Sequence, residues 1–79
     1  MYGQVTIADT ATKVCGRGAP ETILRNVGSV SCWVGDDADV TESTGMLVEA
    51  GDVMGFNGAG PIYAITAAST TTLAFFRAS

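Results

Sequence analysis

The segment ETILRNVGSVSCWV, residues 21–34, decides the fold class of this chain. Its first six residues favour an extended strand, and Asn26 and Gly28 then supply residues that adopt turn conformations at low energy. In the second half, valine and cysteine alternate with serine and tryptophan, so that the apolar side chains share one face and Trp33 lies on the other. A strand, a turn and a second strand predict an antiparallel hairpin.

Short strand-forming segments separated by glycine, proline or polar residues continue on both sides of this hairpin, and signals for helices are nearly absent. With a turn signal about every eight to twelve residues, the pattern predicts an all-β domain, a small antiparallel β-sandwich or barrel of about six to eight short strands. The expected strands are residues 4–8, 11–15, 21–26, 29–34, 46–48, 53–57, 62–66 and 71–77.

The length of the chain, 79 residues, is that of one domain, so residues 1–79 are expected to form a single β domain. A chain of this size buries only about 60% of its unfolded surface, which leaves a thin core. Domains of this kind often gain stability from disulfides, metals or a partner subunit. Residues 1–20 are a candidate N-terminal arm that reaches a neighbouring subunit.

The charge of the chain is low in density and acidic, with a net charge of −4 and only 15% charged residues. Soluble designed surfaces carry roughly 25–35% charged residues, so part of this surface is expected to face another protein. The absence of a basic cluster argues against nucleic acid as a partner, and the net charge argues against anionic membranes. The N-terminus lacks a signal-peptide pattern, so we expect synthesis in a cytoplasm.

The side chains that usually carry catalysis are missing. The chain contains no histidine, which excludes a Ser-His or Cys-His pair built from its own side chains and makes a zinc site improbable. Cys15 and Cys32 are expected to be buried and reduced, with a disulfide as the alternative if their strands are neighbours. A reactive Cys15 beside Arg17 is a less favoured alternative. We therefore expect neither an enzyme nor a bound cofactor.

The most polar segment is the acidic, glycine-bounded stretch 35–45, which predicts a surface loop. Asp36, Asp37 and Asp39 offer carboxylates of the kind that bind calcium, so a metal site here is a weak alternative. The spacing departs from the EF-hand pattern, and a solvated acidic loop is the preferred interpretation. Val40 is the residue expected to pin this loop to the core.

Four aromatic residues are candidates for binding a partner. Trp33 lies on the polar face of its expected strand, and Tyr63 lies in a strand near the end of the chain. Phe75 and Phe76 are adjacent, so in a regular strand they point to opposite faces and one of them lies outside the main core. Because exposed aromatic side chains are preferred anchors of interfaces, these residues are the predicted partner-binding set.

From Leu24 to Arg77 the chain resembles a pattern found in small structural proteins of tailed bacteriophages. Short turns, a polar loop and a threonine-rich final strand follow one another in the same order in both. The matching motifs here are LRNVG (24–28), VSCWVG (30–35), DVT (39–41), GML (45–47), EAGD (49–52) and PIYAITAA (61–68). The structural turn positions are Asn26, Gly28, Gly35, Gly45 and Gly51.

This resemblance implies a β-sandwich that attaches to a virion as a capsid decoration (cement) protein or as a part of a fibre. The implied role is non-enzymatic capsid stabilisation on the capsid surface of a bacteriophage, with the major capsid protein lattice as partner and a homo-oligomer, such as a homotrimer, as the bound form. The alternative function is a carbohydrate- or receptor-binding module of a tail or fibre, with Trp33, Tyr63 and the acidic loop as its site.

Overall fold

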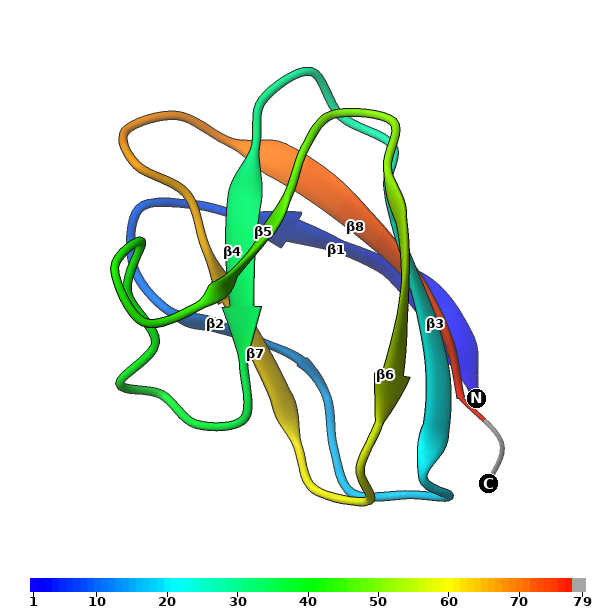
Figure 1. Ribbon diagram of the computed structural model, residues 1–79. Helices are drawn as coiled ribbons and strands as arrows, with labels where there is room; N and C mark the ends of the chain where they lie inside the picture. Colours follow the sequence, from blue (N-terminus) through cyan, green and yellow to red (C-terminus); the bar gives the residue numbers. More distant parts are fainter. Residues whose placement is uncertain (78–79) are drawn as a thin grey trace.

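The computed structural model describes residues 1–77, which contain eight strands and no helix (Figure 1). This confirms the all-β prediction, and each of the eight expected strands is present with small shifts of its ends. The strands are β1 (Tyr2–Ile7), β2 (Thr12–Cys15), β3 (Glu21–Asn26), β4 (Cys32–Gly35), β5 (Met46–Val48), β6 (Val53–Asn57), β7 (Ile62–Ile65) and β8 (Thr71–Arg77).

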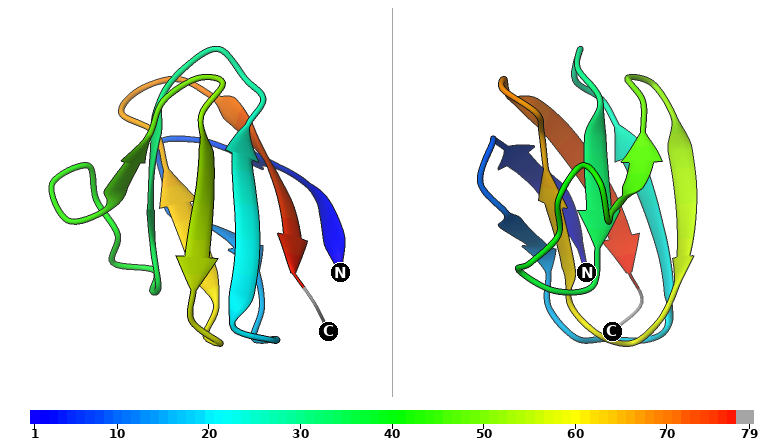
Figure 2. Two further views of the ribbon diagram at one scale, coloured as in Figure 1. Left: turned by 45° about the vertical axis from the view of Figure 1, so that its right-hand side comes forward. Right: turned by 60° about the vertical axis from the view of Figure 1, so that its left-hand side comes forward.

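The strands form two four-stranded sheets in which all neighbours are antiparallel. Sheet A has the order β1-β8-β3-β6, and sheet B has the order β2-β7-β4-β5. The two views in Figure 2 show the sheets as two layers, with β5 and β6 at the edges on one side. The arrangement is a small β-sandwich.

The core lies between the two sheets and is built by every second residue of each strand. Along β3 the exposed and buried positions alternate strictly, as expected for a strand with one face on the core and one on the outside. Fully buried side chains come from both sheets, and Leu24 and Leu73 of sheet A meet Ile62 and Val34 of sheet B in one cluster.

The hairpin predicted over residues 21–34 is wrong, because the two strands belong to different sheets. β3 pairs with β6 and β8, whereas β4 pairs with β5 and β7. The reason is the buried side chain of Asn26, whose amide nitrogen Nδ2 donates hydrogen bonds to the carbonyl oxygens of Val30 (2.8 Å) and Val48 (3.1 Å). These hydrogen bonds hold the segment between β3 and β4 in the conformation in which it crosses from sheet A to sheet B.

Two of the predicted turn glycines have a clear structural requirement. A Cβ atom at Gly28 would lie 2.0 Å from the hydroxyl oxygen of Thr71 and 2.8 Å from the backbone nitrogen of Thr72, so only glycine fits beside β8. Gly51 has a φ of 86°, a backbone conformation that residues other than glycine rarely adopt. Its N–H donates a hydrogen bond to the carbonyl oxygen of Asn26 at 2.8 Å. Both glycines thus help to hold the same end of the sandwich together.

The candidate N-terminal arm, residues 1–20, is part of the sandwich in this structure. β1 pairs with β8 over its whole length, from Tyr2 opposite Phe76 to Ile7 opposite Thr71. β2 pairs with β7 in the other sheet. The segment therefore completes an edge of each sheet within its own chain.

The acidic loop folds back onto the outer face of sheet B. Val40 is buried, as predicted, but it is absent from the cluster between the sheets. It packs instead beside Gly35 and Gly45, where an added Cβ atom would in each case lie 2.8 Å from Cγ2 of Val40. Glycine is needed at both positions because the valine occupies that space.

A buried arginine closes the opposite end of the sandwich. Arg77, at the end of β8, has no exposed surface. Its Nε donates to the hydroxyl oxygen of Thr22, Nη1 donates to the carbonyls of Gly16 (2.7 Å) and Gly60 (2.8 Å), and Nη2 donates to that of Gly58 (2.6 Å). One side chain thereby ties the last strand to the loops that follow β2 and β6.

Candidate binding surface

The outer face of sheet A carries a row of apolar residues that runs across the strands. Tyr2 of β1 lies opposite Phe76 of β8, Phe76 lies opposite Ile23 of β3, and Ile23 lies opposite Gly55 of β6. We call these four residues the apolar row. Ile23 points outward because it lies between the buried Thr22 and Leu24, and the other three members share its face because the antiparallel register places them in line with it.

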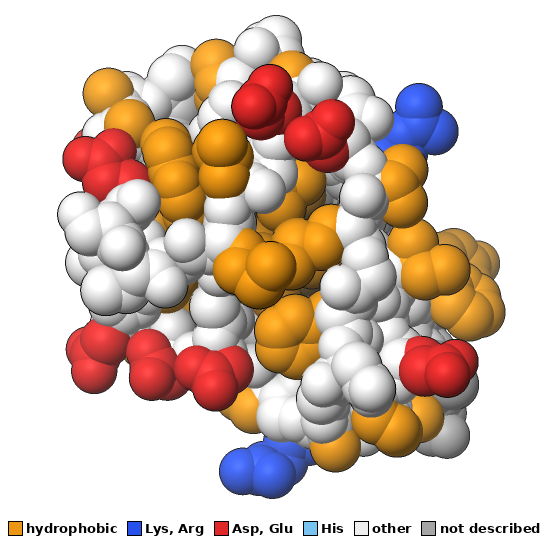
Figure 3. Space-filling model, viewed as in Figure 1, with side chains coloured by type: hydrophobic (Ala, Val, Ile, Leu, Met, Phe, Trp, Pro, Cys, Tyr) orange, Lys and Arg blue, Asp and Glu red, His pale blue; other side chains and the backbone are white. Residues whose placement is uncertain are grey.

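The side chains of the apolar row are unusually exposed for their size. Tyr2 is 80% exposed, Phe76 60% and Ile23 57%, and Val53 in the next row of the same face is 63% exposed. Figure 3 shows hydrophobic side chains gathered on the right-hand edge of the molecule, where sheet A lies. Contiguous apolar patches on soluble proteins commonly mark sites of interaction, so this face is the candidate binding surface.

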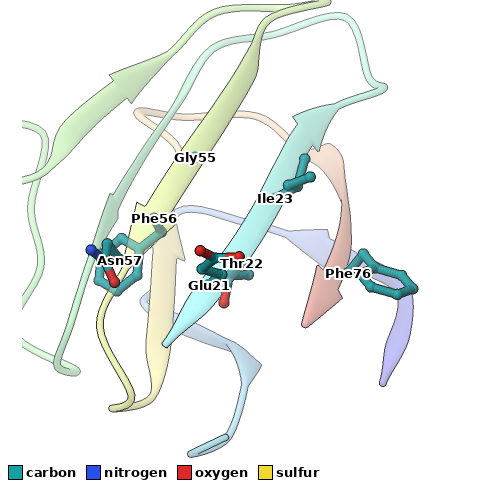
Figure 4. A pocket seen from close by; sticks show the side chains of 7 residues that line it. All are labelled: Glu21, Thr22, Ile23, Gly55, Phe56, Asn57 and Phe76. Carbon is teal, nitrogen blue, oxygen red and sulfur yellow. The ribbon is translucent and has the colours of Figure 1, made fainter. Parts of the chain in front are cut away.

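A shallow depression of about 410 Å³ lies beside the row (Figure 4). Ile23 and Phe76 border it, together with Glu21 and Asn57. It exists because Gly55 has no side chain, and a Cβ atom there would meet no other atom within 4 Å. The register with β3 is regular at this position, so Gly55 marks neither a bulge nor a close packing contact. The depression gives the flat face a hollow that a partner's side chain can enter.

Opposite charges border the row on β3. Glu21 and Arg25 are both exposed and share the outer face with Ile23, which lies midway between them. The two charged residues are four positions apart, which corresponds to about 13 Å along a strand, too far for an ion pair within one copy. The central strand of this face therefore presents an acidic, an apolar and a basic position in order.

The two adjacent phenylalanines point to opposite sides of β8, as the sequence predicted. Phe75 packs against the core cluster, and Phe76 projects outward as a member of the apolar row. Phe75 therefore belongs to the core rather than to a binding surface, whereas Phe76 stays a candidate contact residue.

Trp33 and Tyr63 lie on the outer face of sheet B, on the other side of the sandwich from Phe76. Both are half-buried, and Gly45 of the acidic loop packs directly against Trp33. The predicted partner-binding residues are thus divided between two faces and do not form one surface. The face that exposes aromatic side chains most fully is that of sheet A, through Tyr2 and Phe76.

Sequence reasoning missed three residues of the candidate surface, namely Tyr2, Ile23 and Val53. For Ile23 a signal was present, because it shares its face with Glu21 and Arg25 while Leu24 points to the core. A large aliphatic residue on the charged face of an alternating strand indicates a surface that contacts another protein rather than solvent.

The carboxylates of the acidic loop do not converge. Asp37 is engaged locally, because its Oδ1 accepts a hydrogen bond from the backbone N–H of Asp39 at 2.9 Å. Within residues 1–77 no three acidic or cysteine side chains are close enough to hold a metal ion, so the weak alternative of a site at Asp36, Asp37 and Asp39 gains no support.

The two cysteines are free and buried, and β2 and β4, which carry them, are separated by β7. Burial raises the pKa of the Cys32 thiol to about 11. Because the thiolate is the reactive form, Cys32 is a poor nucleophile at neutral pH. Its place in the core is structural.

The raised pKa of Cys32 predicts a loss of stability in alkali. The folded protein holds the thiol proton more tightly than the unfolded chain, so this contribution is complete below about pH 9 and is lost as the pH rises toward 11. The free energy of unfolding should fall by about 1.4 kcal/mol per pH unit over this range. Urea titrations of wild type and Cys32→Ala at several pH values measure this slope, and equal slopes in the two proteins would contradict the prediction.

Residues 1–77 contain no helix of the length and apolar character needed to cross a membrane. The fold and the surface together define a small β-sandwich with an exposed apolar row on the outer face of sheet A. No family model, curated protein or solved structure matches the chain.

Proposed function

We propose that this protein is a non-enzymatic structural subunit of a virion, a decoration (cement) protein that binds the head lattice of a tailed bacteriophage and stabilises it. The observation that carries the proposal is the uncovered apolar row on sheet A, in which Tyr2 and Phe76 expose most of their rings. Burying such side chains against a partner is favourable by about 25 cal/mol for each Å² of apolar surface.

The character of the surface supports contact rather than chemistry. The face of sheet A offers mainly aromatic, aliphatic and uncharged polar side chains, with Glu21 and Arg25 as its charged residues, and the buried thiol of Cys32 is protonated at neutral pH. The proposed partner is the lattice of the major capsid protein, which follows from the resemblance to phage structural proteins. Many copies bound to one lattice gain avidity, so a modest patch per copy is sufficient.

The proposal predicts that the purified protein binds capsids that lack it. We expect saturable co-sedimentation with heads assembled from the major capsid protein of the same phage, and release of packaged DNA at a higher temperature. Phe76→Ser should weaken binding by tenfold or more, since hot-spot aromatic residues contribute about 2 kcal/mol or more.

Thr70→Ala is a suitable control, because Thr70 is exposed in the loop before β8. Circular dichroism should show that both variants keep the wild-type fold. The proposal fails if the wild-type protein neither sediments with the heads nor changes the temperature of DNA release.

A second candidate function rests on a hollow beside Trp33. This hollow of about 270 Å³ is bordered by the indole and by Ser31, Thr66 and Ser69. The lining of this hollow is mainly apolar, and an aromatic side chain at its border suits the face of a sugar ring, which stacks on it. Binding on a glycan array that is lost in Trp33→Ala, with folding intact, would favour a carbohydrate-binding module over a decoration protein.

A further inference from the structure

We propose that a second copy of this chain covers the outer face of sheet A, forming a symmetric dimer whose two-fold axis runs along the apolar row. The proposal rests on the proposed function only in taking this face as the assembly surface. It replaces the lattice by a second copy as the occupant of that face, so the dimer would contact the lattice through another surface, and Phe76→Ser would lower capsid binding by way of the dimer.

The order of charges on β3 selects this partner. A two-fold axis lying between the two copies and parallel to the row reverses the direction of β3 in the second copy. Ile23 then faces its own counterpart, while Glu21 of each copy faces Arg25 of the other, because each charged residue is about 6.8 Å from Ile23 along the strand. The dimer therefore contains two equivalent pairs of opposite charge around an apolar centre.

The competing symmetric arrangement is disfavoured by the same residues. An axis parallel to β3 would place Glu21 against Glu21 and Arg25 against Arg25. Like charges placed opposite one another in an interface are repulsive and suppress that orientation. Of these two axes, the one along the row satisfies both the charges and the apolar centre, where Phe76 would stack beside the Phe76 of the second copy.

The available surface is of the size that a dimer needs. With about 150–250 Å² for each large side chain, the exposed parts of Tyr2, Phe76, Ile23 and Val53 amount to roughly 500 Å² of surface, most of it apolar. A stable interface buries about 800 Å² per partner. The polar residues around the row supply the remainder as a rim, and they are Gln4, Thr6, Glu21, Arg25, Asn57 and Thr72.

The dimer leaves the two sheet B faces outward, so that one assembly presents two equivalent surfaces. Trp33 and the exposed Leu47 lie on these surfaces. Because these two surfaces point in opposite directions, a lattice contacts only one of them at a time.

Charge reversal tests the geometry directly. Sedimentation velocity of the full chain over a range of concentrations should show a species with twice the 8.1 kDa mass of the chain. Arg25→Glu and Glu21→Arg should each weaken the dimer by about tenfold or more, because each turns two attractive pairs into repulsive ones. Mixing the two variants in equal amounts should restore dimers, now with one copy of each kind.

Lys13→Glu is the matched control, since it makes the same charge change as Arg25→Glu at an exposed residue of sheet B. It should dimerise like wild type. A chain that is monomeric at every concentration, a trimer, or a dimer that ignores the reversals would overturn the proposal.

The outcomes also separate this proposal from the proposed function. A monomer that binds capsids and loses that binding in Phe76→Ser would mean that the lattice itself covers sheet A, so the dimer would be wrong and the decoration role would stand. A charge-dependent dimer that never binds capsids would leave the dimer in place and remove the decoration role.

Discussion

Replacing Arg77 with methionine is expected to lower the free energy of unfolding by about 4 kcal/mol, since each buried polar group left without a partner is destabilising by roughly 1–3 kcal/mol. The guanidinium donates to three loop carbonyls and to the hydroxyl of Thr22, all at one end of the sandwich. Methionine fills much of the same volume but donates nothing. Because a domain of this size is held by only a few kcal/mol, the variant should be largely unfolded at 37 °C.

Urea unfolding followed by circular dichroism measures this effect. Arg17→Met is the control, because Arg17 is exposed, and it should change stability by less than about 0.5 kcal/mol. Arg77→Lys should lie close to Arg77→Met, since an ammonium group cannot reproduce the fork of the guanidinium. If the free energy of unfolding of Arg77→Met lay within about 1 kcal/mol of that of wild type, the prediction would be wrong. Water would then have replaced the lost hydrogen bonds.

The second large effect is expected at Asn26, where aspartate should destabilise the fold by about 3 kcal/mol. The Asn26 amide nitrogen donates to the carbonyls of Val30 and Val48, and its Oδ1 accepts from the N–H of Gly28 (3.1 Å) and the hydroxyl of Thr71 (2.7 Å). Aspartate keeps the shape but turns the donor into a second acceptor. A buried carboxylate oxygen would then face two carbonyl oxygens.

The pH dependence of Asn26→Asp identifies the cause. Burial and the facing carbonyls would raise the pKa of the new carboxyl, so its neutral form is the one that fits the folded state. The deficit relative to wild type should therefore shrink as the pH falls from the raised pKa of the folded state toward the pKa of the unfolded chain, near 4, and should level off below that pH. Asn57→Asp, at an exposed position of β6, should show no such recovery, and a deficit at Asn26 that does not change with pH would contradict this account.

The strands could be predicted from the sequence because their signals are local. Residues 21–26, 46–48 and 53–57 have the same ends in the structure as in the prediction, since turn or loop residues flank each of them, and β8 begins at Thr71 as predicted. The pairing of the strands could not be predicted in the same way. Asn26 was read as a turn residue, but its partners Val48 and Thr71 lie 22 and 45 positions further along the chain.

The binding surface was predicted only in part, for a similar reason. Alternation was sufficient to place Phe75 and Phe76 on opposite faces of β8. The apolar row depends on which strands become neighbours, so that Tyr2 could not be placed beside Phe76, or Phe76 beside Ile23, before the sheet order was known. The sequence predicts that Trp33 is exposed and contacts a partner. In the structure its side chain is half-buried, because Gly45 of the acidic loop packs against it.

The order of strands in sheet A also governs when this protein can fold. β8, the last strand of the described chain, lies between β1 and β3, so the sheet remains in two separate parts until residues 71–77 have been synthesised. Contacts between residues so distant in sequence form slowly, because the long intervening loop must be closed first. β1 thus finds its partner only after residues 71–77 have been made, and sheet A cannot assemble stepwise in the order of its strands along the chain.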